Sequence, residues 1–165
     1  MQFLLLLGAI VYADHSVLID FENRIETCIA KEKLWNELEI AMYRSEDTWL
    51  WPNESSVVKG EGLLEAGEIA VTYSFMMASP TYHYRLQNIV PNQSFDYLAT
   101  KEHPFEGGAS INLLDKDGAV VFLWQGSYLI PSDKWLQKQI FRRFNKRFFR
   151  QLEKNIHKAE ADLCF

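Results

Sequence analysis

The chain has 165 residues, 48% of them hydrophobic and 24% charged, which is typical of a globular domain and excludes a disordered or collagen-like chain. Its net charge of −5 argues against nucleic acid as a partner, because proteins that bind nucleic acid through charge are basic. Aromatic residues make up 14% of the chain. This is more than packing alone usually demands, so we expect large side chains to line a site.

Residues 1–13 form an apolar segment that ends in Ala13 before the polar Asp14. The segment is too short for a transmembrane helix, which needs about 20 residues. It resembles a signal peptide, although no Lys or Arg precedes its apolar run. Two interpretations stay open: a cleaved signal, which would make the protein secreted or periplasmic, and a buried strand or docked segment of a cytoplasmic protein.

The two cysteines, Cys28 and Cys164, belong to no CxxC or Cys/His pattern, so the sequence predicts no metal site. In an exported protein they can form one disulfide. In a cytosolic protein they would be free thiols.

The first predicted elements are a strand and a short helix. Residues 17–27 alternate between apolar and polar, which indicates a half-buried strand. Residues 30–42 place four apolar side chains on one helical stripe: Leu34, Trp35, Leu38 and Met42. Residues 47–53 contain Pro52 and two tryptophans, which predicts a turn or short helix with apolar anchors.

Six strand-like runs follow, separated by turn residues, as in an antiparallel meander. They cover residues 55–60, 68–77, 82–90, 94–101, 108–114 and 119–130. The pair Asp117-Gly118 predicts a tight hairpin between the last two runs.

A long helix is predicted from about residue 133 to about residue 161, with Ser132 or Asp133 as its N-cap. Its apolar residues recur mostly at every fourth position, with Phe141 and Phe149 beside them, so we expect the helix to lie on a sheet. These residues are Leu136, Ile140, Phe144, Phe148, Leu152, Ile156, Ala159 and Leu163.

The C-terminal segment is basic, since residues 132–165 carry nine basic and four acidic residues. Five of the basic residues form a stripe opposite Phe144 and Phe148: Arg142, Arg143, Lys146, Arg147 and Arg150. The first interpretation is a solvated helix face. The alternative is peripheral contact with an anionic membrane.

This order of elements resembles the START-related polyketide-cyclase and lipid-transfer superfamily (SRPBCC) over residues 17–161. Also similar are Leu34-Trp35 after the first strand, the strand entry at 67–73, the turn at 105–108 and Asp117-Gly118. The family's usual Pro is Lys31 or Glu32 here. The resemblance implies one α+β domain with the helix-grip fold, in which a curved seven-stranded antiparallel sheet wraps around a long C-terminal helix, with a short helical segment after the first strand.

The resemblance also implies a cavity between sheet and helix that binds a hydrophobic small molecule, such as a lipid, sterol, quinone or polyketide-like compound, without a cofactor. Alternate strand residues and the helix stripe would line this cavity. The candidates are Tyr73, Phe75, Tyr82, Tyr84, Phe95, Tyr97, Phe122, Trp124, Tyr128, Phe141, Phe144 and Phe148.

No catalytic motif is present: the chain contains no G-x-S-x-G, H-E-x-x-H or P-loop sequence. His83 alternates against two tyrosines and is expected to face solvent, while His103 and His157 are expected at the surface. Two alternative functions stay open. A cavity enzyme of the cyclase or dehydratase type would be favoured by a strongly perturbed pKa inside the cavity. An interaction protein with a basic helix surface would have a filled core.

Overall fold

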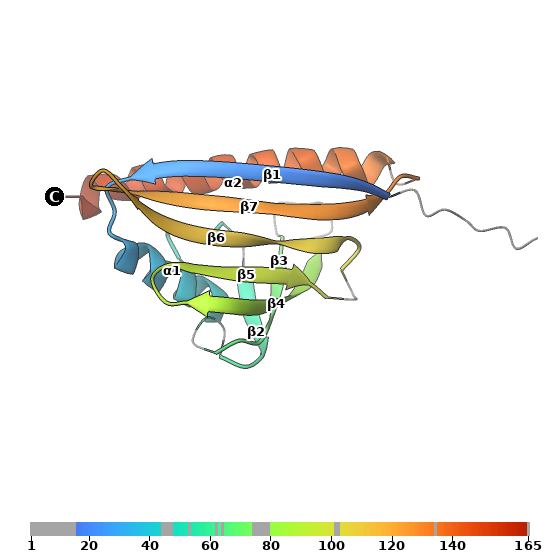
Figure 1. Cartoon of the computed structure of the whole chain (residues 1–165), viewed down its shortest axis with the longest axis horizontal. Helices are drawn as coiled ribbons and strands as arrows, with labels where there is room; N and C mark the ends of the chain where they lie inside the picture. The colour runs from blue at the N-terminus through green and yellow to red at the C-terminus, as the bar shows by residue number, and fades with distance from the viewer. Residues whose placement is uncertain are drawn as a thin grey trace, which may run out of the picture.

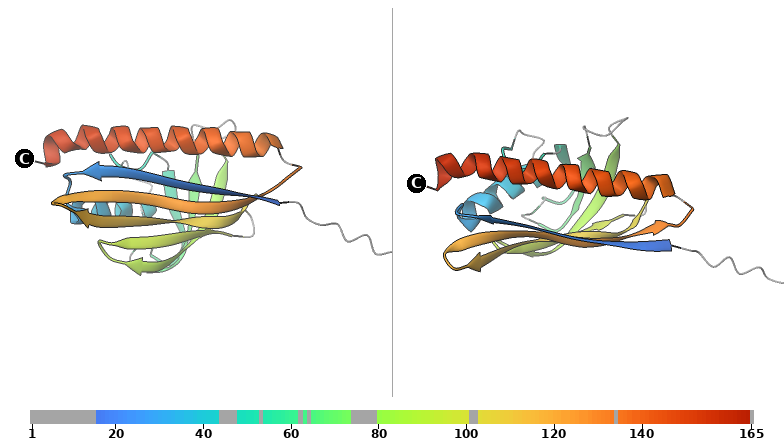
Figure 2. Two further views of the ribbon diagram at one scale, coloured as in Figure 1. Left: turned by 45° about the horizontal axis from the view of Figure 1, so that its top comes forward. Right: turned by 90° about the horizontal axis from the view of Figure 1, so that it is seen from above.

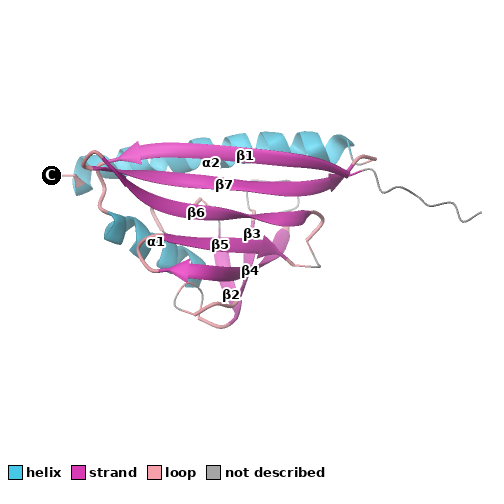
Figure 3. Ribbon diagram, in the orientation of Figure 1, coloured by secondary structure: helices cyan, strands magenta, loops and turns pink. Residues whose placement is uncertain are grey.

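The computed structural model describes residues 16–43, 48–52, 54–61, 63, 65–73, 80–100, 103–133 and 135–164. The elements follow one another as the sequence predicts, from a strand and a helix to a meander and a long helix (Figures 1 and 3). They are β1 (Ser16–Thr27), α1 (Lys31–Tyr43), β2 (Glu54–Lys59), β3 (Glu68–Thr72), β4 (Thr81–Val90), β5 (Ser94–Ala99), β6 (Glu106–Lys116), β7 (Ala119–Pro131) and α2 (Trp135–Leu163).

The seven strands form one antiparallel sheet in the order β1-β7-β6-β5-β4-β3-β2. The first strand therefore joins the last strand of the meander, and Ser16 to Thr27 pair with Pro131 to Val120 of β7. The predicted strands and the helix-grip architecture are confirmed. β3 ends at Thr72, and residues 74–77 of the run predicted there lie outside the described residues.

The hairpin between β6 and β7 turns through Asp117 and Gly118, as predicted. Both residues have positive φ angles, 50° and 86°, and Lys116 pairs directly with Ala119. A two-residue turn of this kind needs left-handed backbone at both positions, which Gly adopts without steric cost and Asp tolerates.

Helix α2 lies along the concave side of the curved sheet, with α1 beside its C-terminal end (Figure 2). It starts and ends about two residues later than predicted. Phe148, Leu152 and Ile156 are buried, but the prediction for the start of the stripe is wrong, because Leu136 is 62% and Ile140 44% exposed. Steps of four residues advance about 40° beyond a full turn, so a long i+4 stripe winds away from the sheet.

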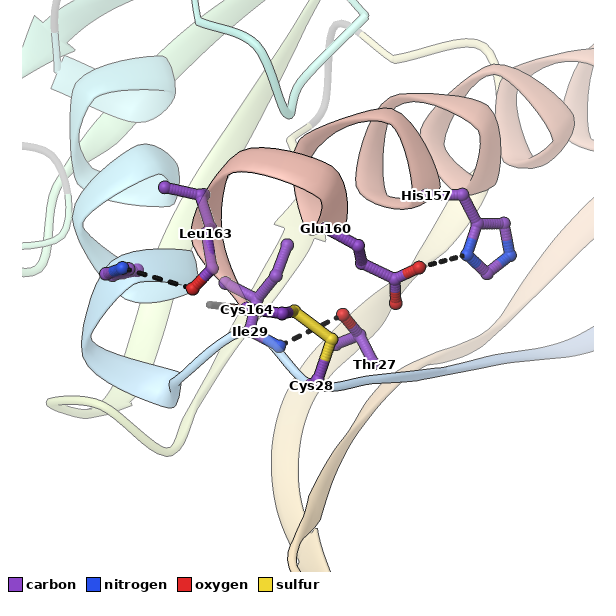
Figure 4. The surroundings of a disulfide bond; sticks show 8 residues. Thr27, Cys28, Ile29, His157, Glu160, Leu163 and Cys164 are labelled. Carbon is purple, nitrogen blue, oxygen red and sulfur yellow. Dashed lines mark hydrogen bonds and ion pairs between the residues drawn. A yellow bond between two sulfur atoms is a disulfide. The ribbon is translucent and has the colours of Figure 1, made fainter.

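The C-terminal end of α2 is covalently attached to the end of β1. A disulfide joins Cys28 and Cys164, whose Cα atoms are 5.6 Å apart (Figure 4). Next to it, Lys33 Nζ of α1 donates a hydrogen bond of 3.3 Å to the carbonyl oxygen of Leu163. The structure therefore selects the disulfide from the two states that the sequence left open.

The main core lies between the sheet, α1 and the C-terminal half of α2. Phe95 of β5 is fully buried and packs edge-to-face on Trp35 of α1. Trp51 and Phe148 make a similar contact, so the segment after α1 also covers α2. In the part of the chain that the structure describes, no helix is long and apolar enough to cross a membrane.

Candidate functional site: a pocket under the start of α2

A pocket of about 270 Å³ lies between the sheet and the first turns of α2. Strand β4 and the residue after β3 supply tyrosines, the connection between β5 and β6 supplies an imidazole, and α2 supplies the facing wall. Its lining residues are Tyr73, Pro80, Tyr82, Tyr84, His103, Pro104, Phe105, Gln137, Ile140, Phe141 and Phe144. None of these described lining residues carries a carboxylate, an ammonium or a guanidinium group.

A chain of hydrogen bonds connects two tyrosines and a histidine in this wall. The hydroxyls of Tyr73 and Tyr84 share a hydrogen bond of 2.6 Å, and the Tyr84 hydroxyl is 3.1 Å from His103 Nε2. On the other side of the ring, Nδ1 lies 2.8 Å from the Phe105 carbonyl oxygen and 3.1 Å from the Phe105 nitrogen. With the ring proton on Nδ1, the imidazole donates to that carbonyl and Nε2 accepts from Tyr84. With the proton on Nε2, Nε2 donates to the Tyr84 hydroxyl, and Nδ1 accepts from the backbone N–H of Phe105.

Burial keeps the tyrosines and the histidine of this hydrogen-bond chain uncharged at neutral pH. It lowers the pKa of His103 to about 4, because the charged imidazolium would lose its hydration; the hydrogen bond to Phe105 opposes this only in part. Burial also raises the pKa of Tyr73, Tyr84 and Tyr128 far above the usual value for a phenol. The described residues of the site therefore offer neutral donors and acceptors and no fixed charge.

The position of His103 corrects the sequence-based expectation that this residue lies at the surface. Its ring is half-buried, stacks on Tyr128 with 5.7 Å between ring centroids, and lies 4.7 Å from the ring of Tyr82. The hydrogen bonds to Phe105 turn the ring inward. His157 is exposed as predicted and bonds to Glu160 (Figure 4).

Two buried polar atoms near the pocket have no hydrogen-bond partner among the described residues: Gln137 Oε1 and Trp51 Nε1. Gln137 lies on the first turn of α2 and lines the pocket. Trp51 lines a deeper hollow of about 20 Å³, next to Tyr73 and Tyr84. Buried polar groups are usually paired. The hollow beside Trp51 has room for about one water molecule as the partner, whereas the larger pocket beside Gln137 has room for a ligand.

The structure divides the twelve predicted lining residues into groups. Five line the pocket: Tyr73, Tyr82, Tyr84, Phe141 and Phe144. Three line only the deeper hollow: Tyr97, Trp124 and Phe148. The remaining residues are Tyr128, which lies behind His103; Phe95 and Phe122, which are fully buried in the core; and Phe75, which lies outside the described residues.

The twelve predicted candidates did not include six of the lining residues: Pro80, His103, Pro104, Phe105, Gln137 and Ile140. For His103 a signal existed, since several buried phenols need hydrogen-bond partners and a histidine follows the aromatic strand β5. Gln137 gave no signal, because a lone Gln at a helix start is ordinary on a surface.

The outer side of α2 is basic and partly apolar. From Trp135 to Leu152 the helix contains six basic residues and no acidic one. The five predicted for membrane contact are exposed: Arg142, Arg143, Lys146, Arg147 and Arg150. Trp135, Leu136 and Ile140 are exposed as well, and Ile140 also belongs to the pocket wall.

Comparison with known proteins shows similarity in structure but not in sequence. No protein-family model matches the sequence, and no curated protein is significantly similar to it. A START superfamily protein from Mycobacterium smegmatis shares 8% identity at a TM-score of 0.60, over 85% of this chain and 98% of that one. The Zhui aromatase/cyclase from Streptomyces sp. R1128 shares 9% identity at 0.62, over 87% and 96%.

A third similar structure is the di-domain aromatase/cyclase StfQ of the steffimycin biosynthetic pathway. It shares 12% identity at a TM-score of 0.66, over 88% of this chain and 50% of that chain. Identities this low establish the fold alone. The chain therefore has the helix-grip fold of the START-related polyketide-cyclase and lipid-transfer proteins.

Proposed function

We propose that the protein binds a hydrophobic small molecule in the pocket between the sheet and the start of α2. The observation that carries this proposal is a pocket of about 270 Å³ between the sheet and α2, walled mainly by aromatic rings. Ligand sites are usually concave and apolar with a few polar groups. A pocket of this size argues against the completely filled core that an interaction protein would have.

Blocking the pocket mouth tests the proposal. Ile140 lines the pocket and is 44% exposed, and Leu114 of β6 is exposed to the same extent away from it. Ile140→Trp should weaken binding of the neutral dye N-phenyl-1-naphthylamine, measured by fluorescence, about ten-fold, or about 1.4 kcal/mol. Leu114→Trp is the matched control and should bind the dye normally. Equal affinity in both variants would rule out this pocket as the binding site.

A second candidate function is a cavity enzyme of the cyclase or dehydratase type. It is favoured by His103, a neutral imidazole in the pocket wall that is hydrogen-bonded to Tyr84. Such a ring can accept a proton from a carbon between two carbonyls, and the carbanion then adds to another carbonyl of the same chain, which forms the carbon–carbon bond. A phenol can protonate the alkoxide that this addition leaves. The imidazolium then protonates the hydroxyl that departs as water, while the phenolate takes the second hydrogen from the attacking carbon, with no cofactor required.

Turnover of a linear poly-β-ketone thioester would test this candidate. If the protein is a cyclase, it accelerates formation of the aromatic product, followed by absorbance, and His103→Phe lowers the rate about 10²-fold or more. The variant should still bind N-phenyl-1-naphthylamine. A wild-type protein that binds the dye but leaves the thioester unchanged would support binding without catalysis.

We also propose that the outer side of α2 contacts anionic membranes, with the pocket mouth toward the lipid. Basic residues attract anionic headgroups by about 1 kcal/mol each near a bilayer, and Trp and Leu side chains insert at the interface. Arg142, Arg143, Lys146 and Arg150 have no ion pair with any described residue. Ile140 connects this surface to the pocket.

Co-sedimentation with vesicles tests the membrane proposal. The protein should bind phosphatidylcholine vesicles that contain phosphatidylserine and not vesicles of phosphatidylcholine alone. Reversing two charges, Arg143→Glu with Lys146→Glu, should reduce binding at least ten-fold, since about 1 kcal/mol is lost per residue. The control pair Lys154→Glu and Lys158→Glu makes the same charge change at the other end of α2. An equal loss of vesicle binding in both double variants would show that binding depends on the net charge of the protein and not on a docking surface at the start of α2.

The disulfide supports export of the protein, because disulfides persist mainly in oxidising compartments. We propose that residues 1–13, which lie outside the described residues, are a signal peptide. Mass spectrometry of the protein recovered from a secreting host should then show a chain that begins at Asp14. Recovery of the chain with Met1 from the cytoplasm would contradict export.

A further inference from the structure

We propose that the ligand of this pocket is an uncharged molecule with an apolar body and a hydroxyl group that hydrogen bonds to Gln137. This inference rests on the proposed function, because it names the ligand class of the same pocket.

Gln137 supplies the polar contact on the helix side. Its side chain lines the pocket, and its Oε1 atom is buried without a hydrogen-bond partner among the described residues. Because this atom has almost no accessible surface in the structure, the amide must turn toward the pocket when a ligand binds to it. An acceptor left in this state loses its hydration and gains nothing in return. A ligand hydroxyl can donate to Oε1 and still accept a hydrogen bond through its own oxygen. A ketone or an ether cannot donate, so neither satisfies this atom.

The sheet side can also meet an uncharged polar group. The hydroxyl of Tyr84 and the ring of His103 line the pocket, and their hydrogen-bond chain can run in either direction. Tyr82 contributes a third hydroxyl at the same wall. These groups can accept from or donate to a neutral ligand without any change in protonation.

A charged headgroup does not fit this wall. A carboxylate buried in the pocket would need a cation, and none of the described lining residues supplies one. The imidazole of His103 cannot serve at neutral pH, because its pKa is about 4. Burial of an unpaired carboxylate is strongly unfavourable. The walls themselves are aromatic, with Phe141 and Phe144 facing the tyrosines, so flat apolar bodies can stack on them.

Three probes with the same ring system separate the contribution of the hydroxyl group from the effect of charge: naphthalene, 2-naphthol and 2-naphthoate, titrated calorimetrically into the full-length protein at neutral pH. Wild type should bind 2-naphthol about five-fold more tightly than naphthalene, as expected for one added hydrogen bond. It should bind 2-naphthoate at least ten-fold more weakly than 2-naphthol. Gln137→Leu should remove the advantage of 2-naphthol over naphthalene.

Gln139→Leu is the matched control, since Gln139 lies two residues further along α2 and does not line the pocket. It should keep the wild-type preference for 2-naphthol. Equal affinities of wild type for naphthalene and 2-naphthol, or 2-naphthoate binding as tightly as 2-naphthol, would overturn this inference while leaving a hydrophobic pocket. Failure of all three probes to bind a folded wild type would overturn the proposed function itself. The comparison of the three probes with the wild-type protein tests the inference even if thermal unfolding shows that a variant is unstable.

Discussion

The C-terminal half of α2 buries Phe148, Leu152 and Ile156, whereas the N-terminal half leaves Trp135, Leu136 and Ile140 exposed. The buried half is also held by the disulfide and by a hydrogen bond of 3.1 Å that Asn155 Nδ2 donates to the Leu50 carbonyl oxygen. The exposed half covers the pocket. One helix therefore stabilises the fold at one end and provides a binding site at the other, where looser packing leaves room for a ligand.

Removing the disulfide is expected to have the largest effect on stability. Cys28 and Cys164 are separated by 136 residues, so Cys28→Ser with Cys164→Ser should lower the free energy of unfolding by about 4 kcal/mol. Urea denaturation measures this loss. Dye binding in the pocket should stay within about two-fold of wild type, because the two sites are far apart and independent. Loss of dye binding in a variant that is still folded in the absence of urea would contradict this division of roles.

Truncation of a leucine in each half sharpens the comparison. Leu152 is fully buried and Leu136 is 62% exposed. Leu152→Ala should therefore cost about 3 kcal/mol. Leu136→Ala should change stability by no more than about 0.5 kcal/mol. Equal losses in urea denaturation would show that the N-terminal half packs as tightly as the C-terminal half.

The pH dependence of stability isolates His103. Its pKa is about 4 in the folded protein and near 6.5 when unfolded, so between these values the unfolded chain binds more protons. The contribution of the neutral ring to stability is complete above about pH 6.5 and is lost as the pH falls toward 4. Because the ring is only partly buried, we expect a loss of about 2 kcal/mol.

The control for this measurement is His103→Gln, which keeps a polar side chain without the titration. The difference in unfolding free energy between wild type and variant should shrink as the pH falls from about 7 to about 4.5. A difference that does not change over this range would place His103 in water and not in the pocket wall.

Local patterns predicted the strands and the hairpin because alternation and turn chemistry depend on neighbours in sequence. Asp117 and Gly118 form the predicted turn. The same alternation placed Phe95 on the inner face of the sheet correctly but could not show that Trp35 of α1 covers it. Which part of that face stays open is decided by helix packing.

Local sequence patterns could not predict the polar residues of the pocket. His103 and Tyr84 are 19 residues apart and meet only when the β5–β6 connection folds over β4. Gln137 belongs to the pocket because the i+4 stripe of α2 winds away from the sheet at its start and a polar residue takes that place. Contacts between segments far apart in the sequence, and not residue type, place His103 and Gln137 in the pocket wall.

Native mass spectrometry of the purified protein, before and after gentle extraction with organic solvent, tests the central claim most directly. We predict one apolar, uncharged molecule bound per chain, which is lost on extraction and can be replaced by N-phenyl-1-naphthylamine. A protein that carries no molecule before extraction and takes up no dye afterwards would contradict the proposal that this pocket binds a ligand.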